Sequence, residues 1–387
     1  MGAGDVDATG SPTYAIFSAR YAPLTGGIES YTKGIATALV RRGRRVIVVT
    51  SQVGATPGRE TDADGVEVVR LPAHSLMGGR LPMPKRNARY RQVMAGLERE
   101  GINRVLVNAR FYGHSIEGLA LARRIGAPSC VLDHGSAYLV LGNPVADAAL
   151  VAWEHVMTAR CRRYRPSFAA VSTASAQWLS TFGIACDTVI PNAIDAASFR
   201  KSDTGRDFRR ELGVGPDTTL VAFCGRLEPE KGALRLARAA GLVDAHDFAF
   251  ALAGEGSERA GIEALGLPNV HLLGTLSHAD LAALFRSSDL FCLPTRSEGF
   301  CTSLIEAASL GLTPVMPVVG GVHEVMGVPA DYGMLLEDRE PATIGRALTK
   351  ARMDGTCGHV EELAARTAKR CSWEHSAELL EASFEAR

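Results

Sequence analysis

Short apolar runs alternate with amphipathic segments from residue 14 onward. Residues 14–19 (YAIFSA) and 45–51 (RVIVVTS) are apolar runs of strand length, and residues 28–43 between them have a different pattern. In that segment the apolar side chains recur at the spacing of one helix face: Ile28, Tyr31, Ile35 and Leu39. Gly43 follows them, where glycine commonly ends a helix. The pattern therefore predicts a strand, a helix and a second strand.

The same alternation continues through the rest of the chain. Further apolar runs predicted as strands cover residues 104–109, 129–135, 168–172, 188–192, 218–227, 247–256, 269–276, 290–295, 313–319 and 332–336. Helical patterns follow these runs, and one of them begins with Ser277 and Asp280, spaced as in a capping box. Strands that alternate with helices in this way favour parallel sheets covered by helices on both faces.

Chain length and one polar segment divide this pattern into two domains. A chain of 387 residues exceeds one ordinary core, and domains of about 150–200 residues are expected. Residues 196–217 are polar and contain glycine, so we predict a linker there. We expect a disordered lead-in at 1–13, a first doubly wound domain at 14–195, a second at 196–372, and a final helix at 373–387 that could pack back on the first domain. Because ligands of such sheets bind beyond the C-terminal ends of the strands, we also expect a cleft between two facing domains.

The net charge of zero conceals an uneven distribution. Residues 1–195 hold 22 Lys and Arg against 15 Asp and Glu, or +7, and the remainder holds 20 against 27, or −7. The basic half would suit an anionic acceptor molecule or an acidic membrane surface. The alternative is ordinary surface charge that is unevenly shared.

The positions of the cysteines and the hydropathy of the chain indicate the cellular compartment in which the protein is expected. The eight cysteines have no spacing typical of a metal site, and Cys130, Cys224 and Cys292 lie in apolar runs, where cysteine acts as a small hydrophobe. The acidic, glycine-rich start does not resemble a signal peptide. No uninterrupted apolar stretch approaches the ~18 residues that a membrane-spanning helix needs. We therefore expect a protein of the reducing cytoplasm.

Several residues that could bind a ligand or take part in catalysis follow predicted strands. Gly26 and Gly27 come after the first strand, where glycine lets the backbone approach a ligand. His134 follows a later strand, and Arg226 with Lys231 follows the first strand of the second half, where a cationic pair could hold a diphosphate. Each signal alone is weak, because turns, structural histidines and exposed loop cations are all common.

Familiar catalytic motifs of other enzyme classes do not occur. The sequence has no Walker loop, no GxGxxG after the first strand, no HExxH and no GxSxG. Phosphotransfer of the P-loop type and hydrolysis by a nucleophile elbow are therefore disfavoured. Hydride transfer from a nicotinamide cofactor is also disfavoured, although the sheet pattern alone would allow it.

Two glutamates flank a predicted helix start in the segment RSEGFCTSLIEAASLG. Glu298 lies in the loop before the helix, and Glu306 lies just inside the helix. Acidic residues there can simply complement the helix dipole. They can also hold the hydroxyl groups of a ligand whose anionic part binds the backbone amides between them.

The order of these pieces resembles the retaining glycosyltransferases of family 4, which have the GT-B fold. The pieces are GGIES, DHG, VIPNAID, CGRLEPEKG, LAGEGS, the E-x7-E stretch EGFCTSLIE, and GGVHE. Most of them are weak individually, but their joint order covers nearly the whole chain. The resemblance implies an α/β protein with two doubly wound Rossmann-like domains facing across a cleft, the first on the acceptor side and the second binding a nucleotide sugar.

By this resemblance the two glutamates bind the neutral part of the donor. Glu306 would accept hydrogen bonds from the ribose of the nucleotide, and Glu298 from a hydroxyl of the donor sugar. The amides between them would hold sugar and phosphate oxygens at the helix N-terminus. These amides belong to Gly299, Phe300, Cys301, Thr302 and Ser303.

The remaining residues would act at the bond between the donor sugar and the diphosphate, which breaks in the reaction. Arg226 and Lys231 would neutralise the diphosphate as it leaves, and Gly27 would approach it from the first domain. His134 would lie beside the sugar near the reacting carbon. The resemblance implies a UDP-sugar as donor, no metal and no other cofactor.

The sequence departs from the family pattern at three points, and two other functions remain as alternatives. Cys301 stands where the family often has glycine, Ala193 stands where PNG is usual, and LGLTPV carries one residue more than the common form. The first departure puts the identity of the donor sugar in doubt. A nucleotide-sugar 2-epimerase and a non-catalytic nucleotide-sugar-binding subunit are the alternatives to a transferase.

The acceptor is not evident from the sequence. We expect no nucleic acid partner, and the acceptor could be a sugar, a lipid or a small metabolite. Two basic segments in the first half suggest peripheral contact with an anionic membrane at the cytoplasmic face, although no aromatic or leucine-rich stripe accompanies them. Their cations are Arg80, Lys85, Arg86, Arg89 and Arg91, and then Arg160, Arg162, Arg163 and Arg165.

Overall fold

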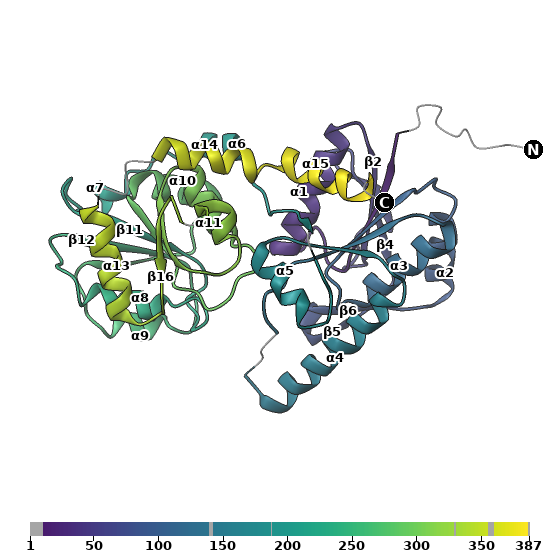
Figure 1. Ribbon diagram of the computed structural model, residues 1–387, viewed down its shortest axis with the longest axis horizontal. Helices are drawn as coiled ribbons and strands as arrows, with labels where there is room; N and C mark the ends of the chain where they lie inside the picture. Colours follow the sequence, from purple (N-terminus) through teal and green to yellow (C-terminus); the bar gives the residue numbers. More distant parts are fainter. Residues whose placement is uncertain (1–10, 139–141, 187, 329, 355–359, 386–387) are drawn as a thin grey trace, which may run out of the picture. The chain divides into compact units, whose positions relative to one another are not determined.

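The computed structural model describes residues 11–138, 142–186, 188–328, 330–354 and 360–385. They form two compact units (Figure 1). Unit 1 comprises Met1–Val171, Ser175–Ile190 and Ser376–Arg387, and unit 2 comprises Ser172–Ala174 and Pro191–His375. Most of the predicted lead-in, residues 1–10, lies outside the described residues.

Unit 1 is built on an eight-stranded sheet with the order β10-β9-β8-β7-β1-β2-β4-β3. Its strands are β1 (Thr13–Ser18), β2 (Arg45–Ser51), β3 (Arg59–Thr61), β4 (Glu67–Leu71), β7 (Arg104–Asn108), β8 (Ser129–Asp133), β9 (Ser167–Ala170) and β10 (Thr188–Val189). Every pair is parallel except β3 with β4. The predicted parallel sheet is therefore confirmed.

Four strands of unit 1 were not predicted. They are β3, β4 and a separate antiparallel hairpin of β5 (Ala73–Leu76) and β6 (Leu81–Pro84). The short β3 and most of β5 are exposed or half-buried, so they carry no apolar pattern. In β4 the apolar run is interrupted by Arg70, which is buried and pairs with Glu60 at 2.6 Å.

Helices cover both faces of this sheet. They are α1 (Gly27–Arg41), α2 (Ala88–Leu97), α3 (Gly113–Ile125), α4 (Pro144–Arg162), α5 (Thr173–Ser180) and the part of α15 (Trp373–Glu385) that belongs to unit 1. Ala15 and Phe17 of β1 share one core with α2, α3 and α4. The alternate residue Tyr14 contacts Phe384 of α15, with ring centroids 5.9 Å apart. This is the period of two that a strand imposes on its side chains.

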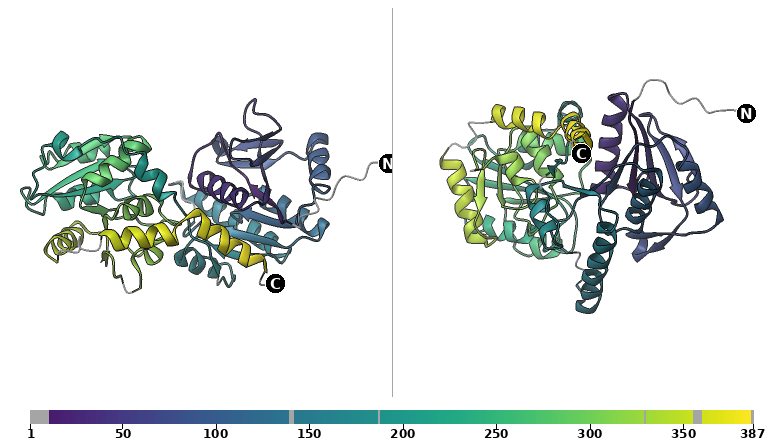
Figure 2. Two further views of the ribbon diagram at one scale, coloured as in Figure 1. Left: turned by 90° about the horizontal axis from the view of Figure 1, so that it is seen from above. Right: turned by 45° about the vertical axis from the view of Figure 1, so that its right-hand side comes forward.

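Helix α15 is attached to unit 1 by ion pairs as well. Glu381 receives hydrogen bonds from Arg42, the C-cap of α1, at 2.7 Å and from Arg44, in the turn before β2, at 2.6 Å. The turned views show α15, in yellow, beside the purple α1 (Figure 2). The last helix of the chain thus completes the unit that the first strand begins.

Unit 2 has a parallel six-stranded sheet with the order β13-β12-β11-β14-β15-β16. The strands are β11 (Thr219–Cys224), β12 (Phe248–Ala253), β13 (Val270–Gly274), β14 (Leu290–Cys292), β15 (Thr313–Pro317) and β16 (Met334–Leu336). Each coincides with a predicted apolar run. On one face α8 (Ala233–Ala240) packs against α13 (Pro341–Met353), and α9 (Arg259–Glu263) packs against α8.

The other helices of unit 2 form a second group around α11 (Thr302–Ser309). Helices α10 (His278–Ser287), α12 (Val322–Met326) and α14 (Val360–Arg370) all contact α11. Helix α10 begins as predicted, because the Ser277 hydroxyl accepts a hydrogen bond from the backbone amide of Asp280 at 3.0 Å.

The segment predicted as a linker is instead folded onto unit 2. It contains α6 (Ala196–Lys201) and α7 (Phe208–Leu212). Phe199 and Phe208 anchor these helices and are only 2% and 1% exposed. The linker prediction was wrong because two buried aromatic side chains outweigh the polar residues that surround them.

Candidate active site

The loop between β14 and α11 is held in place before its helix begins. Ser172 donates a hydrogen bond to the carbonyl oxygen of Gly299 at 2.7 Å. The amide of Gly321 donates to the carbonyl oxygen of Phe300 at 2.7 Å. A Cβ at Gly321 would lie 2.6 Å from the Phe300 ring, so only glycine allows this close approach. The glycines of GGVHE therefore support the loop that precedes α11.

Cys301 is the last residue of that loop and has an unusual backbone conformation. Its φ and ψ angles are 81° and 90°, a region that non-glycine residues seldom occupy. The Cys301 thiol lies 3.5 Å from the Ser303 hydroxyl, and burial raises its pKa to about 12. The thiol is therefore protonated and unreactive at neutral pH, and the position has the geometry that glycine prefers.

Glu298 and Lys231 form an ion pair within unit 2. The ammonium of Lys231 lies 2.5 Å from a carboxylate oxygen of Glu298, and the two side chains are 20% and 12% exposed. A Cβ at Gly232 would lie 2.4 Å from the carbonyl oxygen of Pro294, so this glycine lets the two loops meet. The structure thus brings together two predicted site residues that are 67 positions apart.

Arg226 and Glu306 have other partners. Arg226 pairs with Glu230 at 2.6 Å, and both side chains are largely exposed. Glu306 lies in α11 with an 11% exposed side chain, and His278 approaches its carboxylate at 3.0 Å. The His278 ring packs on Phe199 with centroids 4.6 Å apart, and its hydrogen bond to Glu306 raises the pKa of the imidazole. Helix α11 therefore carries a buried carboxylate that is already hydrogen-bonded.

The predicted residues of unit 1 lie at the C-terminal ends of its strands. His134 follows β8, and its Nε2 lies 3.3 Å from Oδ1 of Asn108, the last residue of β7. Its ring packs edge-on against Tyr31 with centroids 4.8 Å apart. Burial lowers the pKa of His134 to about 3, so the imidazole is neutral at pH 7.

Asn108 also determines which nitrogen of His134 carries the proton. The Thr32 hydroxyl donates to the carbonyl oxygen of Ile28 at 2.7 Å and can therefore accept from the Asn108 amide nitrogen at 2.8 Å. The amide oxygen of Asn108 then faces His134, which must donate from Nε2. The other nitrogen, Nδ1, has no hydrogen-bond partner among the described residues, so its lone pair can accept a hydrogen bond from a ligand.

Gly27 is the first residue of α1 and has open space beside it. A Cβ built at this position meets no heavy atom within 4 Å. At Gly26, by contrast, a Cβ would lie 2.5 Å from the Glu29 carboxylate, which pairs with Arg20 at 2.9 Å. A Cβ at Gly26 would thus displace the end of the Glu29 side chain, whereas Gly27 leaves room for a ligand to approach the helix.

Two family models match consecutive parts of the chain. Residues 25–198 match the model described as Glycosyltransferase Family 4, and residues 205–370 match the model described as Glycosyl transferases group 1. Together they span both units. The chain belongs to glycosyltransferase family 4.

Curated relatives agree with this assignment, and a solved structure has a similar fold. A GDP-mannose-dependent alpha-mannosyltransferase of Mycolicibacterium smegmatis is 27% identical over 90% of this chain and 92% of its own length. A D-inositol 3-phosphate glycosyltransferase of Segniliparus rotundus is 28% identical over 93% of this chain and 84% of its own length. Anabaena HepE, solved in complex with UDP, has a TM-score of 0.70 and 17% identity, covering 97% of this chain and all of that one. The fold is GT-B, as predicted, and the family 4 protein is an enzyme.

One buried cluster near His134 was not predicted. Arg110 is fully buried, donates to both oxygens of Asp133 at 2.6 Å and also pairs with Glu154. Burial raises the pKa of Asp133, and it raises that of Glu154 to about 7, whereas Arg110 opposes both shifts. Asp133 immediately precedes His134, so the cluster fixes the backbone that carries the histidine. The DHG motif gave no signal for Arg110, because the arginine comes from a different loop.

His278 was also missed. The capping box located the start of α10 but did not indicate that His278 would reach a carboxylate on α11. Among the described residues, no group of three or more His, Cys, Asp or Glu side chains could hold a metal ion. Nor is any helix in the described part of the chain long and apolar enough to cross a membrane.

Proposed function

We propose that this family 4 enzyme transfers a hexosyl group from a nucleoside diphosphate sugar with retention at the anomeric carbon. The observation that carries the proposal is the arrangement around α11. The Lys231–Glu298 pair precedes the helix, and the buried carboxylate of Glu306 lies within it. A cation, a row of backbone amides and two carboxylates supply partners for phosphate oxygens and for hydroxyls.

Each group has a task in breaking the bond between sugar and diphosphate. Negative charge develops on the diphosphate, and Lys231, which is already held by Glu298, stabilises that charge. Glu298 and Glu306 accept hydrogen bonds from neutral hydroxyls of the sugar and the ribose. Arg226 is exposed beside Glu230 and would turn to the diphosphate when the donor binds.

His134 contributes as a neutral hydrogen-bond acceptor. Its depressed pKa keeps the imidazole uncharged, and Nε2 is occupied by Asn108. The free Nδ1 can therefore accept a hydrogen bond from a sugar or acceptor hydroxyl near the reacting carbon. An imidazolium there would oppose the positive charge that develops on the sugar ring, so a neutral ring suits the reaction.

For the nucleotide of the donor we retain UDP as the prediction and name GDP as the second candidate. A UDP complex of the GT-B protein HepE supports UDP. GDP is supported by the name of the GDP-mannose-dependent mannosyltransferase from Mycolicibacterium smegmatis. That relative has a higher sequence identity to this chain than HepE has. The acceptor we propose is a sugar, a lipid-linked molecule or a small metabolite, so that the product is a glycoconjugate.

Peripheral contact with an anionic membrane remains part of the proposal for unit 1. Arg160, Arg162 and Arg163 are exposed near the end of α4, and Val145 and Val156 on the same helix are 81% and 55% exposed. Basic and apolar side chains on one helix are the combination that holds proteins at anionic lipid surfaces.

The test is to incubate the protein with UDP- and GDP-sugars and to follow release of the nucleotide. We expect slow hydrolysis of one donor without acceptor and faster turnover when the right acceptor is added. An epimerised sugar seen by NMR with donor alone would support the 2-epimerase alternative instead. Failure to bind or turn over any nucleotide sugar would refute the proposal.

A further inference from the structure

One arginine in unit 1 holds two carboxylates away from solvent. Arg110, in the loop after β7, donates to both oxygens of Asp133 at 2.6 Å, and its second terminal nitrogen donates to Glu154 of α4. The side chains of Arg110 and Asp133 are fully buried, and that of Glu154 is 9% exposed. Asp133 is the last residue of β8, and His134 follows it directly. The cluster therefore connects α4 to the loop that carries the histidine.

The loop that carries Arg110 is held from several sides. Ala109 has a φ of 64°, in a region that residues other than glycine seldom occupy, and its carbonyl oxygen accepts a hydrogen bond from the Ser115 hydroxyl at 2.5 Å. The Cys161 thiol donates to the carbonyl oxygen of Arg110 at 3.1 Å, and the guanidinium carbon lies 4.1 Å from the centroid of the Phe182 ring. Such a backbone conformation persists only where the surroundings impose it, and it is concentrated at functional sites.

The three charged side chains of the cluster do not balance. With both carboxyl groups ionised, one guanidinium faces two negative charges, and one negative charge remains in excess. Burial raises the pKa of both carboxyl groups, that of Glu154 to about 7, and Arg110 opposes the shifts. Glu154 therefore gains or loses its proton near neutral pH.

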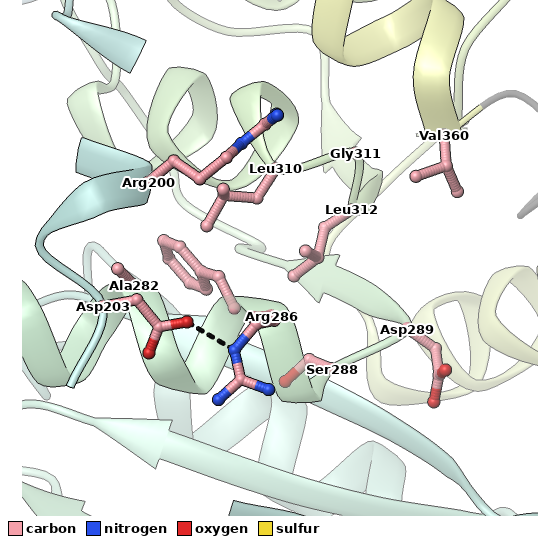
Figure 3. Close-up of a pocket in the computed structure, with 11 residues that line it drawn as sticks. Arg200, Asp203, Ala282, Arg286, Ser288, Asp289, Leu310, Gly311, Leu312 and Val360 are labelled. Atoms are coloured by element: carbon pink, nitrogen blue, oxygen red, sulfur yellow. Dashed lines mark hydrogen bonds and ion pairs between the residues drawn. The ribbon is translucent and has the colours of Figure 1, made fainter. Parts of the chain in front are cut away.

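Ion pairs at a cavity on unit 2 show a different balance. The cavity has a volume of about 310 Å³, and beside it Arg286 pairs with Asp203, while Asp289 pairs with Arg209 (Figure 3). Each carboxylate there has its own arginine and is partly exposed, at 18% and 36%. Burial would raise the pKa of Asp203, but its hydrogen bonds outweigh burial and lower it. A carboxylate with its own arginine thus stays ionised at neutral pH, in contrast to Glu154.

The charged groups that act on Glu154 are Arg110 and Asp133. Burial raises the pKa of Cys161 on α4 to about 12 and lowers that of His114 on α3 to about 3, so both are neutral at pH 7. Other titratable side chains of α4, and of α3 that packs against it, have partners of their own. These are His155 with Tyr138, Arg162 with the carbonyl oxygen of Phe182, Glu117 with Arg86, and Arg124 with Glu98.

We propose that Arg110 and Glu154 are positioning residues of the transfer reaction, which hold His134 in its working orientation only while Glu154 is ionised. The inference rests on the proposed transferase function, in which His134 accepts a hydrogen bond near the reacting carbon. An ionised Glu154 forms a charge-assisted hydrogen bond with Arg110, about twice as strong as a neutral one. This bond keeps the guanidinium against Asp133, whose backbone leads directly into His134. Protonation of Glu154 weakens the bond and loosens that backbone.

The charge that serves the reaction lowers the stability of the fold. Because the folded-state pKa of Glu154 is raised above its ordinary value, the folded protein prefers the protonated form. Its stability therefore falls as the pH rises from the ordinary carboxyl range to about 7. Glu154→Gln imitates the protonated form and leaves Arg110 paired with Asp133. The variant should be less active than the wild type but no less stable, whereas loss of a merely structural residue lowers both.

The experiment measures release of nucleotide by the full chain at saturating donor between pH 6 and pH 8. UDP-glucose and GDP-mannose are tried first, and the donor that the wild type turns over is used for all variants. The matched control is Glu98→Gln, since Glu98 is a partly exposed glutamate of unit 1 that pairs with Arg124. His155→Gln is the second control, because His155 is the adjacent titratable side chain on α4. Thermal unfolding and the Kd for the nucleotide are measured on the same samples.

We expect kcat of the wild type to fall about five- to tenfold from pH 8 to pH 6, the ratio for one group with a pKa of about 7. Glu154→Gln should be about tenfold slower than the wild type at pH 8, the scale for a slightly misplaced group, and nearly independent of pH. Its unfolding temperature at pH 8 should equal or exceed that of the wild type, and its Kd for the nucleotide should match. Both control variants should keep the wild-type profile.

A kcat of the wild type that stays constant from pH 8 to pH 6 would overturn the inference. So would a Glu154→Gln variant that keeps the wild-type profile, or one that loses activity and unfolding temperature together. If His155→Gln alone abolishes the fall at low pH, the titration belongs to that histidine and the inference fails. In each of these cases nucleotide release by the wild type still supports the proposed function. A wild type that releases no nucleotide from any nucleotide sugar would refute the proposed function and this inference with it.

Discussion

Replacing Glu306 by glutamine should weaken nucleotide binding without unfolding unit 2. The carboxylate is 11% exposed and is proposed to accept hydrogen bonds from the ribose hydroxyls. Hydrogen bonds to charged groups are worth about 1.5–3 kcal/mol, and each 1.4 kcal/mol is about tenfold in affinity. We therefore expect the Kd for the nucleoside diphosphate to rise about 10- to 150-fold.

Calorimetry with UDP and with GDP at pH 7.5 measures the effect. Glu263→Gln is the matched control, because Glu263 is an exposed glutamate of α9 that pairs only with Arg259 in the described structure. Thermal unfolding of both variants should stay close to that of the wild type. An unchanged Kd in the folded Glu306→Gln variant would refute the ribose assignment.

The pH dependence of the same titration tests the contact between His278 and Glu306. The folded-state pKa of His278 is raised by this hydrogen bond. The bond is therefore strongest below the ordinary histidine pKa and is lost as pH rises through the folded value. Protonated His278 competes with the ribose for Glu306, so nucleotide affinity should fall from pH 8 to pH 6. In His278→Ala this slope should be smaller, and an equal slope would exclude the competition.

Three further predictions follow from the site. Lys231→Ala should lower turnover at saturating donor at least about 100-fold, the scale for losing one preorganised donor to developing charge; near-normal turnover would make Lys231 a surface feature. Cys301→Gly should raise the unfolding temperature, because glycine relieves about 1–3 kcal/mol of strain at φ 81°, and a lower temperature in thermal denaturation would contradict this. Vesicles of anionic lipid should co-sediment the protein at low salt and release it at high salt, and a protein that stays in the supernatant at low salt would rule out membrane contact.

The order of elements was predictable because it depends on local periodicity. Apolar runs gave the buried strands of both sheets except β4, whose apolar run is interrupted by the buried Arg70, and the capping box gave the start of α10. The strands β3 and β5 were not predictable, because exposed residues need not be apolar. Phe199 and Phe208 were mistaken for linker residues, since their burial depends on helices that come much later in the chain.

The candidate site was predictable only in part. The motifs located Glu298, Glu306 and Lys231, and the ion pair of Lys231 with Glu298 follows from two loops that a glycine allows to meet. The roles of Arg110 and His278 depend on tertiary contacts between separate loops or helices, and such contacts leave no local pattern. The protonation state of His134 likewise depends on burial, which a three-residue motif does not encode.

The attachment of α15 to unit 1 has a consequence for how the chain folds during synthesis. Phe384 and Glu381 cover Tyr14, Arg42 and Arg44, yet they emerge from the ribosome only after all of unit 2. At about 5–20 residues per second, the interval is about 10–40 s. During that time the Tyr14 side of the first sheet lacks its final cover, so unit 1 is most open to misassembly while unit 2 is still being made.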